Sequence, residues 1–145
     1  MPQLTAITRF PVKGLGPEQL PHVELTANAT LPHDRAWAIE NGPSPFDDRA
    51  PGHVKKKQVL MLVGQGELAR LDGRYSEEGR TVTASLDGGA PIDVQLDNAA
   101  SPPPLFDRLR TLLGDAVRGP LRLVHAPGQA MTDIAMPQIS LINAA

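Results

Sequence analysis

The sequence contains no cysteine, almost no net charge, few aromatic residues and no long apolar segment. Without cysteine the chain has no disulfide, no thiolate nucleophile and no cysteine-ligated zinc or iron–sulfur site. Lys and Arg number 14 against 16 Asp and Glu, which argues against general binding to nucleic acid or a membrane surface. The longest apolar run, residues 59–63, is too short to span a membrane and the N-terminus has no signal-peptide pattern, so we expect a cytoplasmic protein.

Glycine and proline are abundant instead, with 13 and 15 among 145 residues, which favours strands and turns over long helices. The clearest pattern is an antiparallel meander in which Val82, Ala84 and Leu86 alternate with polar residues in its middle strand. The short apolar run at 59–63 fits either a buried strand or one helical turn. We expect strands at residues 4–12, 22–25, 35–40, 68–75, 80–86, 92–96, 121–125 and 138–143.

One α-helix is predicted near residues 102–113. Ser101 can cap its N-terminus, prolines are tolerated in the first turn, and Gly114 suits the position after its end. Leu105 and Leu109 begin an apolar stripe with helical spacing. Because six or more short strands must protect their edges, the sequence predicts a mainly β fold, a small β-barrel of mostly antiparallel strands with one helix.

Three basic residues are candidates for binding an anion. Lys13 ends a strand and Gly14 turns the chain at once, so an ammonium lies beside exposed backbone N–H groups, although a solvated lysine in a turn explains the pattern too. Arg35, after Asp34, could reach the same anion if the two strands adjoin. Lys57 belongs to a lysine run whose alternative role is to protect an edge strand.

Other kinds of site find little support. No serine lies in a Gly-x-Ser-x-Gly elbow, and no Walker loop follows a strand. The histidines lack the helical spacing of a metal site, so solvated or hydrogen-bonded roles are expected for His22, His33, His53 and His125. We therefore assign no catalytic residue and no metal ligand.

Three separated segments resemble the N-terminal β-barrel domain that precedes the MOSC domain (molybdenum-cofactor sulfurase C-terminal domain). Residues 9–15 are similar to that family's aromatic-Pro-Val-Lys-Ser/Gly opening, and residues 34–39 to its Asp-Arg-x-Trp strand. Lys57, with the apolar run behind it, stands in place of a basic residue before an apolar segment. Farther on, Asp133 and residues 137–145 look like the first strand of the MOSC domain itself.

The resemblance implies a molybdenum cofactor, a pterin that bears an anionic phosphate. It implies that Lys13, Gly14 and Arg35 help to hold the anionic end, with Lys57 as a further cofactor-binding candidate. Gly14 stands where many relatives have serine. The family's cysteine, which takes the metal or a sulfur atom, belongs to the MOSC domain and has no counterpart here.

The resemblance also divides the chain. Residues 1–126 would form the barrel domain, and 127–145 a loop and the opening strand of a truncated MOSC domain. We expect an anionic small molecule or pterin as partner, no nucleic acid and no membrane, and no enzyme activity of the chain on its own. No residues support a pyridoxal phosphate site. Two alternatives remain open: a stand-alone enzyme using Lys13, Arg35 and Asp34, or an interaction module that pairs through strand 138–143 with a second copy or a missing MOSC domain.

Overall fold

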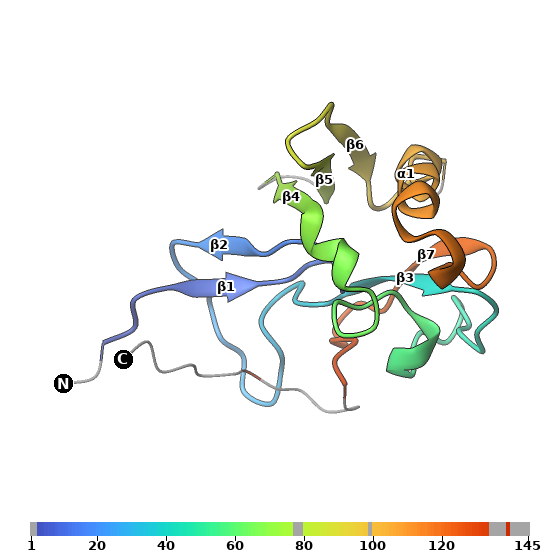
Figure 1. The fold of residues 1–145 in the computed structure, drawn as a ribbon. Coiled ribbons are helices and arrows are strands. Elements are labelled where there is room, and N and C mark those ends of the chain that lie inside the picture. The colour runs from blue at the N-terminus through green and yellow to red at the C-terminus, as the bar shows by residue number, and fades with distance from the viewer. Residues whose placement is uncertain (1–2, 77–79, 99, 134–138, 140–145) are drawn as a thin grey trace.

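The computed structural model describes residues 3–76, 80–98, 100–133 and 139. Within these residues the chain forms short strands, one α-helix and short 3-10 helices (Figure 1). In chain order they are β1 (Ile7–Arg9), β2 (Glu18–Leu20), β3 (Trp37–Asn41), η1 (Lys56–Gln58), η2 (Gly66–Arg70), β4 (Leu71–Tyr75), β5 (Thr81–Leu86), β6 (Ile92–Gln95), α1 (Pro103–Leu113), η3 (Gly114–Ala116) and β7 (Leu121–His125).

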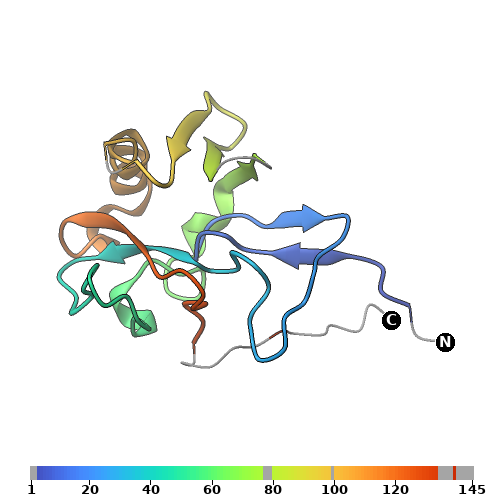
Figure 2. The ribbon, with the colours of Figure 1, turned by 180° about the vertical axis from the view of Figure 1, so that it is seen from behind.

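The strands pair antiparallel in separate ladders: β1 with β2, β3 with β7, and β4–β5–β6 as a meander. The expected mainly β fold with one helix is therefore confirmed, and so is the meander, where Val82 pairs with Val94 and Ala84 with Ile92. The described sheets do not close into one barrel. Both ribbon views show the β3–β7 pair below α1 and the β1–β2 ladder extending away from them to the other side (Figures 1 and 2).

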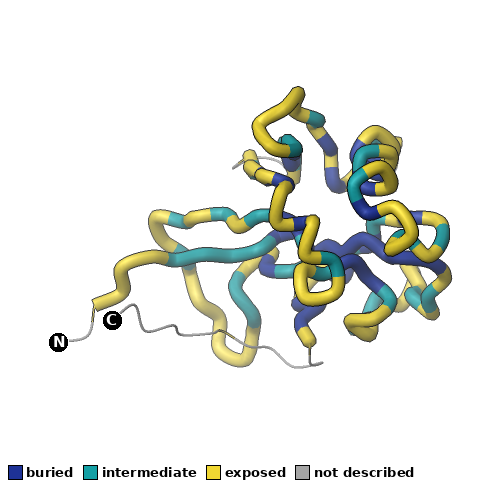
Figure 3. Tube along the Cα trace, viewed as in Figure 1, coloured by how far each residue is buried: buried dark blue, intermediate teal, exposed yellow. Residues whose placement is uncertain are grey.

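Strand β3 is the central element. All five of its residues are buried, and the tube view shows the longest buried stretch along it (Figure 3). Beyond its partner β7, it makes a parallel bridge from Trp37 to Val12 and an antiparallel bridge from Glu40 to Val59. Segments far apart in sequence thus meet along a single strand, and this arrangement positions the residues considered below.

Helix α1 packs the apolar stripe predicted for it against this strand and the meander. Leu105 and Leu109 are fully buried, and Gly114 ends the helix with a positive φ of 52°. The predicted cap is wrong, because Pro102 holds the N-cap position and the Ser101 hydroxyl accepts a hydrogen bond from the Gln95 N–H instead (2.8 Å). Serine here fixes the end of β6, and the prolines alone begin the helix.

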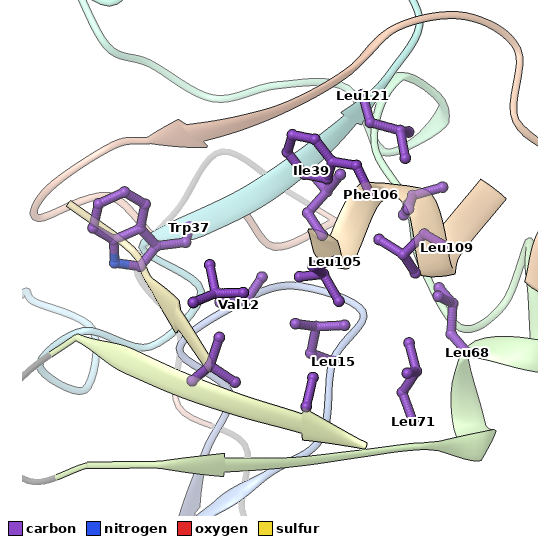
Figure 4. Close-up of a cluster of buried hydrophobic side chains, with 14 of the residues drawn as sticks. Val12, Leu15, Trp37, Ile39, Leu68, Leu71, Leu105, Phe106, Leu109 and Leu121 are labelled. Carbon is purple, nitrogen blue, oxygen red and sulfur yellow. The ribbon is translucent and has the colours of Figure 1, made fainter. Parts of the chain in front are cut away.

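The main core lies between α1, β3 and the meander. Apolar side chains from these elements point toward one another in the close-up (Figure 4). The labelled members are Val12, Leu15, Trp37, Ile39, Leu68, Leu71, Leu105, Phe106, Leu109 and Leu121. Each fully buried leucine contributes about 2 kcal/mol of transfer free energy to folding, so this cluster is the main source of stability.

Two strand predictions need correction. The strand expected at 22–25 is wrong: β1 pairs with Glu18–Leu20, and Pro21, which has no N–H to donate, ends that ladder. Only the start of the 59–63 run joins a sheet, through the single bridge of Val59, and the chain then turns, leaving Val63 93% exposed. The strand predicted at 138–143 lies outside the described residues, apart from Ile139.

Candidate functional site

The two predicted basic motifs lie side by side because the segment after β1 runs parallel to the segment leading into β3. The Arg35 N–H donates to the Phe10 carbonyl (2.7 Å), and the Lys13 N–H donates to the Trp37 carbonyl (2.8 Å). Residues 24 and 25 positions apart in the chain are therefore fixed by backbone hydrogen bonds, a geometry that local sequence pattern does not encode.

Lys13 is a buried lysine, only 7% exposed. Its Nζ lies 3.2 Å from Oδ1 of Asp133, whose side chain is 61% exposed. Burial lowers the pKa of Lys13 and outweighs the opposing contact with Asp133, while the positive charges of Arg35 and Lys56 lower the Lys13 pKa further. The hydrogen bond from Lys13 lowers the pKa of Asp133, and Lys56 and Arg35 act in the same direction.

Arg35 is held in place by a buried carboxylate. Asp34 is 5% exposed and accepts a hydrogen bond from Arg35 Nη1 (2.5 Å) through one oxygen and from the Phe10 N–H (2.8 Å) through the other. The guanidinium also lies over the Phe10 ring, 5.2 Å from its centroid. A third of the Arg35 side chain still faces solvent, so it can meet a ligand while its position is fixed.

The lysine run contributes Lys56 to this cluster. Lys56 and Lys57 both lie in η1, yet only Lys56 influences the pKa values of Lys13 and Asp133. Lys57 contributes a backbone contact: its carbonyl accepts a hydrogen bond from Arg118 Nη2. The sequence prediction named Lys57 and not Lys56, on the expectation of strand alternation where the chain forms one turn of 3-10 helix.

Asp133 is the other member that reasoning from motifs gave no role. The Met131 N–H donates to the Arg35 carbonyl (2.9 Å), which brings the segment after β7 against the cluster. We name Lys13, Arg35, Lys56 and Asp133 the cationic cluster. It contains more positive than negative charge, and its single carboxylate is the most easily displaced part because most of it faces solvent.

Gly14 follows Lys13 and is required by the backbone. Its φ is 86°, and a Cβ added there would lie 2.9 Å from the Leu60 carbonyl oxygen. That contact is closer than real Cβ atoms approach, and the oxygen belongs to backbone that pairs with β3 through the Leu60 N–H and the Ile39 carbonyl (2.8 Å). The space beside Lys13 is therefore closed to any larger residue unless the chain moves.

Comparison with protein-family models gives a match to the MOSC N-terminal beta barrel domain over residues 1–106. The chain belongs to this family. No curated protein and no solved structure matches it. The match includes Lys13, Gly14, Arg35 and Lys56 and ends within α1, so β7 and Asp133 lie beyond the matched part of this MOSC N-terminal domain.

The described part of this MOSC N-terminal domain was compared with the requirements of a metal site and of a membrane span. Within residues 3–76, 80–98, 100–133 and 139, no group of three or more His, Asp or Glu side chains is arranged to hold a metal ion. No helix among the same residues is long and apolar enough to cross a membrane. The cationic cluster is accordingly the feature whose chemistry we develop.

Serine at position 14 is expected to destabilise this chain. Gly14→Ser should lower the free energy of unfolding by about 2 kcal/mol, because the side chain meets the Leu60 carbonyl and the backbone has positive φ. Gly128→Ser is the matched control: its φ is 73° but no heavy atom lies within 4 Å, so about 1 kcal/mol is expected. Urea unfolding measures both, and equal losses would contradict the steric argument.

Proposed function

We propose that this chain is the N-terminal domain of a MOSC-type protein and that its cationic cluster forms part of the surface holding the anionic end of a molybdenum cofactor. One observation carries the proposal: the buried ammonium of Lys13 is paired with the mostly exposed carboxylate of Asp133, and the positive charges of Arg35 and Lys56 act on both groups. Membership of this family supports a molybdenum cofactor as the source of the anion, and the cluster has the charge that would hold it.

The cluster has the properties of an anion site. A lysine buried beside other cations is costly unless an anion compensates it, and Asp133 does so at present. A phosphate carries more negative charge than a carboxylate and accepts more hydrogen bonds, so it would satisfy Lys13 and the exposed part of Arg35 together. Asp133 would then move away into solvent at a small cost in free energy, because 61% of its side chain is already exposed.

The residues fit only one end of the cofactor. Lys13, Arg35 and Lys56 would bind a phosphate, whereas the sequence holds no cysteine to ligate the metal or carry sulfur. When bound, the cofactor supplies the redox chemistry, and this chain supplies charge and orientation at the phosphate. Gly14 contributes no hydroxyl, so the cations must provide the side-chain contacts.

A stand-alone acid–base enzyme would use the Asp34 carboxylate as its general base, and this carboxylate is already engaged. Both oxygens of Asp34 already accept hydrogen bonds, from the Phe10 N–H and from Arg35, and the side chain is buried. A general base must reach the substrate proton, which this geometry does not offer. The alternative of pairing through 138–143 depends on residues outside those described and stays a prediction.

The test is titration of the chain with inorganic phosphate, molybdate and molybdopterin, followed by backbone NMR shifts. Shifts are expected at Lys13, Arg35 and Lys56, and Lys13→Met should weaken phosphate binding by at least about tenfold, as expected for the loss of a charge-assisted hydrogen bond. Arg74→Met removes a charge from an 84% exposed side chain outside the cluster and should change affinity little.

A second variant separates loss of the site from loss of the fold. Asp133→Asn removes the competing carboxylate and leaves Lys13 in place, so it should raise phosphate affinity several-fold. Shifts confined to residues outside the cluster, or unchanged affinity in both Lys13→Met and Asp133→Asn, would refute the proposed site. A spectrum of each variant without ligand shows whether the fold is intact.

A further inference from the structure

A groove with a volume of about 300 Å³ lies outside the cationic cluster. It is lined by residues of the loop before β3, by the start of β3, and by the end of β7 with the turn that follows, together with Arg80. Lys13, Arg35 and Lys56 do not line it. Asp34 does, but its two oxygens are already taken by the Phe10 N–H and Arg35.

A stacked pair of flat rings forms one wall of the groove. Trp37 and His125 are direct partners in the β3–β7 ladder, and their rings lie parallel, with centroids 3.8 Å apart and an interplanar angle of 6°. Pro32 and Pro127 add apolar surface to the lining. The groove therefore has a flat, apolar wall on which another ring can pack.

Two rings that line this groove carry nitrogen atoms that make no hydrogen bond to the described residues. Trp37 is only 7% exposed, and among the described residues its Nε1–H has no hydrogen-bond acceptor. The ring nitrogens of His125 likewise make no hydrogen bond within that part of the chain. The indole nitrogen is not a buried unsatisfied atom, so its N–H reaches solvent and can donate to a ligand oxygen.

The charge around these donors is positive. Burial lowers the pKa of His125, and the nearby Arg80 and His33 lower it further, which shows that both lie close enough to act on the ring. Within the described part of the chain, Arg80 forms a distant ion pair with Asp97 (3.9 Å), and both side chains are more than half exposed. Such a pair is weak, so the Arg80 guanidinium remains able to bind another anion.

We propose that this groove binds a small organic anion with a flat ring, of the aromatic carboxylate class. The ring packs on the His125 side of the stacked pair and on the prolines, and the carboxylate accepts hydrogen bonds from Arg80 and His33. A volume of about 300 Å³ is at the lower end for ligand pockets, so the occupant is a single-ring molecule. This site is independent of the phosphate-binding function proposed above, because the two share no cationic side chain.

The test uses the fluorescence of Trp37, the single tryptophan in the sequence, during titration with benzoate. A saturable change is expected for the wild type. Arg80→Gln should weaken benzoate binding at least fivefold, whereas Arg74→Gln, which removes an exposed arginine from the same meander outside the groove, should not. Benzamide, with the same shape and no charge, should bind at least tenfold more weakly than benzoate.

Further arms separate this site from the cationic cluster and from other anions. Lys13→Met should bind benzoate as the wild type does, whereas its phosphate binding is weakened at least about tenfold. No saturable response to benzoate, equal binding of benzamide, equal competition by inorganic phosphate, or loss of benzoate binding in Lys13→Met would each overturn the proposal. Because Arg80 is more than half exposed, its replacement leaves the fold intact and the comparison remains informative.

Discussion

Replacing Asp34 by alanine is expected to lower the free energy of unfolding by about 3 kcal/mol, the scale for breaking a buried ion pair. The carboxylate is 5% exposed and accepts hydrogen bonds from the Phe10 N–H and from Arg35. Alanine leaves both donors without their acceptor, and it does so where the segment after β1 joins the segment before β3. The loss therefore affects the backbone pairing that positions Lys13 as well as the Arg35 side chain.

Two further variants divide this effect into its parts. Asp34→Asn keeps an oxygen that can accept from the Phe10 N–H and removes the charge that pairs with Arg35, so its loss should be clearly smaller than that of Asp34→Ala. Asp72→Ala is the matched surface control, since that carboxylate is 62% exposed and lies 3.7 Å from Arg74, and its effect should stay within about 0.5 kcal/mol. Equal losses for Asp34→Ala and Asp72→Ala in urea unfolding would show that Asp34 has no structural role.

The parts of the fold that sequence predicts well depend on neighbours in the chain. The meander follows from alternation in β5 and from short turns, and α1 follows from the spacing of Leu105 and Leu109 between prolines and Gly114. The exceptions are also local. The Ser101 hydroxyl accepts a hydrogen bond from a backbone N–H of β6 and does not cap α1. The position of β2 is set by its register with β1, which residue propensity does not encode.

The candidate site was predictable only in its first two members. Lys13 and Arg35 stand out in the sequence because each adjoins the end of a segment predicted as a strand, but their adjacency depends on the parallel bridge between Val12 and Trp37. Asp133 reaches Lys13 from 120 residues away, through contacts of the chain after β7 that no local pattern specifies. The groove beside Trp37 depends in the same way on the pairing of β3 with β7, so histidines expected to be solvated became part of a wall.

The second large effect is expected in α1. Leu109→Ala should lower the free energy of unfolding by about 3 kcal/mol, because its side chain is fully buried in the main core and its removal leaves a cavity. Alanine has the highest helix propensity, so the loss comes from packing and not from the helix itself. The core that surrounds Leu109 also contains Val12, which precedes the buried lysine, and Trp37, which lines the groove.

Leu112→Ala is the control on the same helix. Leu112 is half-buried at the edge of the core, so the same chemical change should cost about 1 kcal/mol. Urea unfolding followed by Trp37 fluorescence measures both variants, with an unchanged slope showing that the unfolded state is unaffected. Equal losses at positions 109 and 112 would mean that α1 does not present Leu109 to the core. The predicted difference therefore tests whether packing of this helix, rather than its formation, holds together the strands that position Lys13 and Trp37.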